Sequence, residues 1–164
     1  MAKRSGILIG TAGVYHVASQ LAQQGFHAAV TFGNAPSVDI LVASPNGSST
    51  ISLQVKTSHW ALRTRGRGSK KQPHHYEWDV GQKSAYLNQT DLFFAFVDLK
   101  LGKCELPEVF IVPSQRVFDA FDKPYFKSGT SRRWRWRWHP GLKEIEEYKT
   151  AWATLHNRLN KTDN

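Results

Sequence analysis

Cysteine is nearly missing from the 164-residue sequence, with Cys104 as its single example. One thiol excludes a disulfide framework and a cysteine-based zinc site within one chain. Long apolar runs are missing too. None approaches the roughly 20 residues that cross a bilayer, so we expect no membrane span. Residues 1–10 are basic and then briefly apolar, and the apolar part is too short for a secretion signal, which favours a cytoplasmic location.

Acidic residues are scarce relative to basic ones. The chain has 13 Asp and Glu against 22 Lys and Arg, which gives a formal charge of +9 at neutral pH and a pI near 9.9. Such a basic chain favours polyanionic partners, because each phosphate contact releases condensed counterions. A basic protein that is merely soluble has the same composition, so the clustering of the charges has to separate these alternatives.

The rest of the composition is typical of a folded domain. Apolar residues make up 40% and charged residues 21% of the chain, which argues against general disorder. The length is usual for one domain, and we expect a single domain over residues 1–164.

Apolar periodicity predicts both helices and strands. Residues 11–24 have helical spacing, between Thr11 as a candidate N-cap and Gly25 as a left-handed stop. Two later helices are expected, one capped by Ser114 and one over residues 143–159. Strands are expected at residues 27–32, 38–42, 50–57, 92–99 and 108–112. Three consecutive strands with short turns suggest an antiparallel meander, which the later two complete into a mixed sheet flanked by helices, an α/β (α+β) fold.

Basic residues cluster in the middle of the chain, over residues 63–71. This Gly-containing segment has no apolar periodicity, so we expect an exposed loop. It follows closely on the strand at residues 50–57, and such a loop would bind DNA phosphates. A solvated loop without a ligand is the alternative. The candidate DNA-binding residues here are Arg63, Arg65, Arg67, Lys70 and Lys71.

A second basic cluster alternates arginine with tryptophan over residues 132–138. On an extended strand the two residue types would face opposite sides. We expect the indoles of Trp134, Trp136 and Trp138 to pack in the core or in a dimer interface, because exposing tryptophan is unfavourable. Base stacking on exposed indoles is the alternative. The candidate DNA-binding residues here are Arg133, Arg135 and Arg137.

Three polar residues lie on two neighbouring predicted strands. Asp39 is near the start of one strand, and Gln54 and Lys56 are near the end of the next. In a hairpin these positions lie opposite one another, and side chains two apart share a face. Two oxygen donors would suit Mg²⁺ or Mn²⁺, which retain several waters, and the lysine would assist attack by water. A solvated polar edge is the alternative.

The pattern Pro36-Ser37-Val38-Asp39 followed by Gln54-Val55-Lys56 resembles the split PD-(D/E)XK motif of restriction-endonuclease-like and Holliday-junction-resolvase-like nucleases. The resemblance covers most of the chain to about residue 122 and is strongest over residues 33–57. It implies an αβββαβ core. Residues 123–164, which lie beyond the resemblance, are expected from their own pattern to form an Arg/Trp-rich segment and a helix. It also implies that Asp39 and Gln54 bind the metal and that Asp39, Gln54 and Lys56 form the catalytic site.

One position departs from that family pattern. Members with glutamine in the third strand commonly have a glutamate in the first helix, where this chain has Val14 directly after Gly13. Asp39 is then the only anion of the motif, which weakens binding of a hard cation.

Three functions follow as hypotheses. The first is a metal-dependent DNA endonuclease that hydrolyses phosphodiester bonds. The second is a catalytically degenerate DNA-binding protein of the same fold. The third is a homo-oligomeric interaction protein, for example a homodimer, with the Trp-rich segment as its interface.

Overall fold

The computed structural model describes residues 5–31, 37–122 and 136–160. Its first element, α1 (Gly6–Gln23), begins earlier than the periodicity indicates, because Ser5 and not Thr11 is the N-cap and its Oγ accepts a hydrogen bond from the Leu8 amide at 3.3 Å. Ile7 and Leu8 are 80% and 62% exposed, so this turn has no buried face for an apolar pattern to reveal. The helix ends before Gly25, whose φ of +86° is left-handed as expected.

The main sheet has five strands in the order β1-β2-β3-β7-β8. β1, β2 and β3 form an antiparallel meander, β7 lies parallel to β3, and β8 lies antiparallel to β7. The predicted mixed sheet and its antiparallel meander are confirmed. The bounds of the strands are β1 (His27–Val30), β2 (Ile40–Ala43), β3 (Thr50–Ser58), β7 (Leu92–Asp98) and β8 (Glu108–Pro113).

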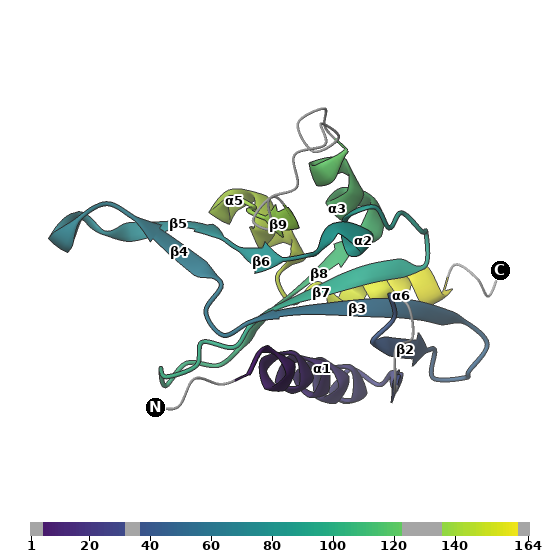
Figure 1. The fold of residues 1–164 in the computed structure, drawn as a ribbon. Coiled ribbons are helices and arrows are strands. Elements are labelled where there is room, and N and C mark those ends of the chain that lie inside the picture. Colours follow the sequence, from purple (N-terminus) through teal and green to yellow (C-terminus); the bar gives the residue numbers. More distant parts are fainter. Residues whose placement is uncertain (1–4, 32–36, 123–135, 161–164) are drawn as a thin grey trace.

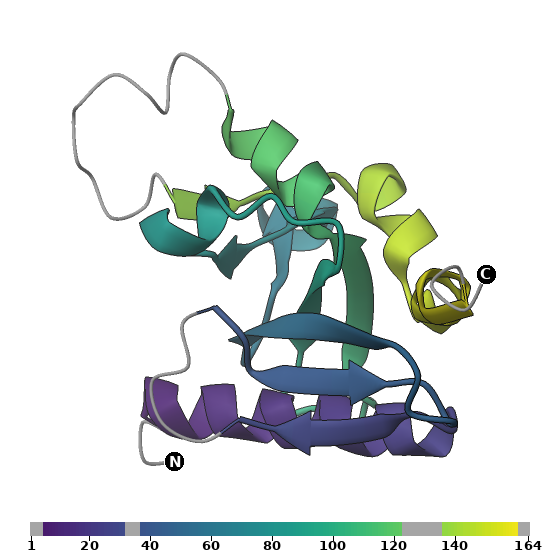
Figure 2. The ribbon, with the colours of Figure 1, turned by 90° about the vertical axis from the view of Figure 1, so that its right-hand side faces the viewer.

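Helices cover both faces of this sheet, which makes three layers (Figure 1, Figure 2). On one face α1 and α6 (Trp152–Asn160) pack on a core that includes Val17, Ile40 and Leu155. The other face carries an aromatic core with Trp78, Phe94 and Phe96. Over it lie α2 (Gln82–Ala85), α3 (Ser114–Phe121), α5 (Leu142–Ile145) and the two-stranded sheet of β6 (Trp78–Asp79) and β9 (Arg137–Trp138). The predicted mixed α/β fold with flanking helices is confirmed.

The segment expected as a loop over residues 63–71 is a β-hairpin. β4 (Leu62–Arg65) pairs antiparallel with β5 (Gln72–Tyr76), and a 3₁₀ turn, η1 (Gly68–Lys70), joins them. Figure 1 shows this hairpin projecting away from the layers. The expected exposure is confirmed, but the expected loop is wrong. Both faces of most of the hairpin meet solvent, so its strands show no apolar alternation.

The C-terminal part also differs from expectation. The helix predicted over residues 143–159 is three pieces, α5, η3 (Glu146–Tyr148) and α6. The chain turns at Thr150, where φ is +47°, after Lys149 forms a β-bridge to Phe110 of β8. A contact with a distant strand thus interrupts an otherwise helical pattern.

Ser114 is not the cap of α3. The helix begins at Ser114 itself, after Pro113, and the Ser114 hydroxyl donates to the Gln89 carbonyl at 2.7 Å and accepts from the Gln89 amide at 2.9 Å. Over the described ranges no helix has the length and apolar character needed to span a bilayer.

Candidate functional site

Asp39 directly precedes β2 and lies opposite the middle of β3. The pairing of Ile40 with Leu53, continued by one residue, places Asp39 across from Gln54. The Asp39 amide donates to the Leu53 carbonyl at 2.9 Å, and the Asp39 carboxylate accepts from the Val55 amide at 2.7 Å through Oδ2. The carboxylate therefore takes a backbone donor of β3, which orients it toward that strand.

Gln54 places a polar group in the core. Its side chain is only 9% exposed, and its Oε1 has no hydrogen-bond partner among the residues that the structure describes. In the sheet it lies beside Phe94 of β7, which is fully buried. A buried amide oxygen without a donor is unfavourable by about 1–3 kcal/mol, so a ligand at this oxygen would remove a cost.

Lys56 points toward α2 from the same face of β3. Its Nζ donates to the Oγ of Ser84 at 3.0 Å. Burial lowers the pKa of Lys56, although the charges of Asp39 and Asp79 partly oppose the shift. Asp39 thus lies close enough to Lys56 for their charges to interact, and Gln54 shares the Lys56 face of β3. That these three residues form one catalytic or metal site stays a prediction.

Ser84 is a member of this site that sequence reasoning missed. It is 28 positions from Lys56 and lies in a four-residue helix, so no local pattern marks it. Its side chain is only 7% exposed. Asp79, a residue of β6, also belongs to the surroundings of Lys56 through its charge.

A hollow of about 330 Å³ adjoins Asp39 between α1 and the sheet. Val14 and Asp39 both line it, so the helix position where the nucleases that this chain resembles commonly have glutamate borders the same hollow as Asp39. Gln54 is not among the lining residues, whereas its neighbour Val55 is. The full lining is Gly10, Thr11, Val14, Tyr15, Val30, Thr31, Asp39 and Val55.

A second hollow, of about 210 Å³, lies at the base of the hairpin. Thr57 and Ser58 at the end of β3 line it together with Arg63 and Asp79. The hairpin therefore begins beside the strand that carries Gln54 and Lys56.

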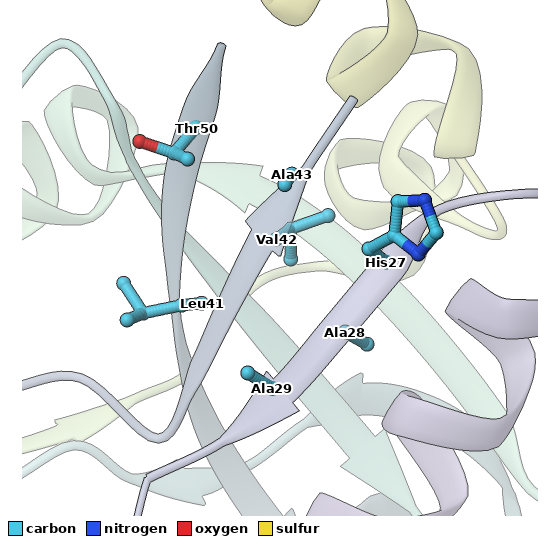
Figure 3. A pocket seen from close by; sticks show the side chains of 7 residues that line it. All are labelled: His27, Ala28, Ala29, Leu41, Val42, Ala43 and Thr50. Carbon is cyan, nitrogen blue, oxygen red and sulfur yellow. The ribbon is translucent and has the colours of Figure 1, made fainter. Parts of the chain in front are cut away.

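A third hollow, of about 250 Å³, lies over β1, β2 and the start of β3 (Figure 3). Its lining is mostly aliphatic, with the side chains of Leu41 and Ala43 among them, and includes no carboxylate. The only imidazole there, His27, has its Nε2 3.2 Å from the Pro45 carbonyl. This hollow offers no reactive group to the site.

The described basic residues that the sequence predicts to bind DNA divide into two groups, those paired with a carboxylate and those that are not. Arg63 and Arg137 bind the same Glu77 carboxylate oxygen, at 3.1 and 3.0 Å, and His139 lies 3.3 Å from the other oxygen. Burial alone would raise the pKa of Glu77, but the hydrogen bond and charge of Arg63, with Arg137 and His139, lower it. These two arginines are thus engaged within the protein.

The second group consists of cations on the hairpin. All four are exposed, and none forms an ion pair with a carboxylate within residues 5–31, 37–122 and 136–160. They are Arg65, Arg67, Lys70 and Lys71. Arg133 and Arg135 lie outside the described residues, as does Trp134.

Trp138 is buried, as the alternation predicted. It is 4% exposed and its ring centroid lies 4.5 Å from that of Phe96. Trp136 packs partly buried against the same core, and Arg137 between them is exposed. For Trp138 the packing role is confirmed over base stacking.

The fold has a solved neighbour. A bacterial homing endonuclease matches this chain with a TM-score of 0.57 and 15% identity, covering 98% of this chain and 96% of that chain. At this identity the likeness shows a shared fold and nothing about activity. No family model matches the sequence. A search of curated proteins found no significant match either. Membership of the PD-(D/E)XK superfamily stays a prediction.

Proposed function

We propose that this protein is a DNA endonuclease that uses Mg²⁺ or Mn²⁺ to hydrolyse phosphodiester bonds at Asp39, Gln54 and Lys56. The observation that carries the proposal is the buried Oε1 of Gln54, which has no partner among the described residues and lies across the β2–β3 pair from Asp39. The nuclease-like fold supports it, since the matched protein is described as a homing endonuclease.

The donor types present, one carboxylate and one amide oxygen, are those that a hard divalent cation prefers. Asp39 supplies a carboxylate and Gln54 an amide oxygen, and Mg²⁺ prefers oxygen donors and completes its shell with water. One anion is few for such an ion, so we expect modest affinity that depends on the phosphate of the bound DNA as a further ligand. When bound, the metal would polarise the scissile phosphate and lower the pKa of an attacking water.

Lys56 would act as the general base that accepts a proton from the attacking water. Burial disfavours its charged form, which increases the fraction of neutral amine at a given pH. A neutral Nζ accepts a proton from the attacking water while the water oxygen forms its bond to phosphorus and the ester oxygen leaves. Ser84 Oγ, 3.0 Å from Nζ, keeps the amine in place and is a positioning residue.

A second candidate function is DNA binding without cleavage. Val14 favours it, because an aliphatic side chain occupies the wall of the Asp39 hollow where an acidic ligand would strengthen metal binding. In that case the basic hairpin would retain its role and the metal would not bind.

Calorimetric titration with Mn²⁺ and nicking of supercoiled plasmid test the proposal together. Wild type should bind Mn²⁺ and nick DNA, and Asp39→Asn should lose both. Asparagine still offers an oxygen to the Val55 amide, so the variant should remain folded. Lys56→Ala should lose nicking while its DNA affinity stays within about tenfold, because one lysine is a small part of the phosphate-binding charge.

Exposed Asp119→Asn on α3 is the matched control and should behave as wild type. Salt-dependent DNA binding without Mn²⁺ binding or nicking would replace the proposal with the second candidate. Absence of DNA binding would remove both and leave the homo-oligomeric interaction protein.

A further inference from the structure

The β4–β5 hairpin is an exposed arm. Every residue from 64 to 74 is exposed, whereas Tyr76 at its base is buried against Phe110 and Trp78. The base is also held by the ion pair of Arg63 with Glu77. At about 3.3 Å per residue, the six residues from 62 to 67 extend roughly 20 Å. The arm is thus anchored at one end and free along its length (Figure 1).

The charged side chains of this hairpin arm are all basic. The sequence contains no Asp or Glu between Asp39 and Glu77, so the arm has no acidic residue of its own. Its four free cations lie on β4, on the turn and directly before β5. Lysines and a proline on an edge strand also prevent aggregation, but that role does not require the exclusion of every acidic side chain.

The shape of the arm restricts the partner. The register of β4 and β5 shifts between Arg63 and Thr64, so that Arg63 pairs with His75 and Thr64 with Pro73, which leaves His74 as a bulge. A bulge increases the right-handed twist of a two-stranded ribbon, which is already large. A twisted ribbon of this kind can follow the right-handed path of a DNA groove.

We propose that the hairpin enters the major groove of double-stranded DNA. The inference rests on the proposed function, since it assumes that DNA is the partner. The major groove of B-DNA is about 12 Å wide and admits a two-stranded ribbon, whereas the minor groove is about 6 Å wide. The major groove of A-form RNA is deep and narrow, so an RNA duplex does not admit the arm.

Within the groove the cations have separate tasks. Arg65 projects from a strand and can bind a guanine edge through two hydrogen bonds, while Lys70 and Lys71 at the turn bind phosphates as point charges. Because β3 leads into β4 beside Asp79 and Thr57, DNA held by the arm would run past the candidate site.

Binding to DNA whose major groove is blocked by bulky base modifications tests the proposal. Two duplexes of one sequence are compared in EDTA, one unmodified and one whose cytosines carry glucosylated 5-hydroxymethyl groups that project into the major groove. Wild type should bind the filled duplex at least about tenfold more weakly, which corresponds to the loss of one good base contact. The variant with Arg65→Ala, Arg67→Ala, Lys70→Ala and Lys71→Ala should bind both duplexes equally.

The charge control is Lys103→Ala with Lys143→Ala, both exposed and outside the hairpin, and it should discriminate as wild type does. Equal wild-type affinity for the two duplexes would overturn the major-groove assignment while leaving DNA as the partner. Equal or tighter binding to an RNA duplex would overturn it as well. No salt-dependent binding to either DNA duplex would instead defeat the proposed function.

Discussion

At Gly13 the backbone of α1 lies against Thr57 of β3 so closely that a Cβ added to the glycine would be 1.9 Å from the threonine Oγ1 and 2.8 Å from its Cβ. Only glycine permits this approach. The next residue along the helix is Val14, which lines the hollow beside Asp39. The contact therefore determines where α1 meets the candidate site.

Gly13→Ala should destabilise the protein. Rotation of Thr57 moves its Oγ1 but not its Cβ, so the helix or the strand has to shift, which costs about 1–3 kcal/mol in a packed core. Gly10→Ala is the matched control on the same helix, because a Cβ there meets nothing within 4 Å. It should stabilise the protein by about 0.5–1 kcal/mol through helix propensity. Urea unfolding measures both, and equal effects at the two positions would contradict the close contact.

Nicking by the proposed endonuclease should rise with pH and level off below the ordinary lysine pKa of about 10.4. Burial lowers the pKa of Lys56, so its amine becomes neutral at a lower pH than that of an exposed lysine. The Ser84 oxygen accepts from the ammonium and favours the charged form, so Ser84→Ala should lower this pKa further and move the profile to lower pH.

The same shift can be measured without activity, by NMR titration of the Lys56 side chain in both proteins. Ser19→Ala, an exposed serine on α1, should leave the Lys56 pKa unchanged. A Lys56 pKa that is the same in wild type and Ser84→Ala would show that Ser84 has no positioning role.

The hairpin cations should determine much of the salt dependence of DNA binding. Replacing Arg65, Arg67, Lys70 and Lys71 by alanine should reduce the slope of log K against log salt by up to about 3–4, at roughly 0.9 per lost phosphate contact. The Lys103→Ala, Lys143→Ala protein should keep the wild-type slope. Fluorescence anisotropy over a range of salt concentrations gives both slopes, and an unchanged slope in the hairpin variant would place the phosphate contacts elsewhere.

Val14→Glu should strengthen Mn²⁺ binding, because it adds a second carboxylate to the hollow that Asp39 lines. Without metal it should lower stability, since Val14 packs partly buried against the core and a carboxylate there is desolvated. Val14→Gln is the control, with a similar size and no charge. Calorimetry that finds equal Mn²⁺ affinity in the two variants would mean that position 14 does not reach the ion.

Several parts of this structure follow from local pattern. Gly25 ends α1 because it adopts a left-handed φ at no steric cost, and β7 is apolar on both faces because it is interior to the sheet. The opposition of Asp39 and Gln54 follows from a single short hairpin, in which strand alternation and turn length determine the register. These features depend on residues close together in the chain.

Other parts depend on contacts between distant segments, for which no short pattern exists. Ser84 joins the site because α2 is placed over β3, and the helix predicted over residues 143–159 is broken because Lys149 pairs with β8. The β4–β5 hairpin is held at its base by Tyr76 and by the ion pair of Arg63 with Glu77, while its solvated strands have no buried face. Local propensity is weak compared with such packing and pairing, so the positions of these elements were decided by the assembled fold.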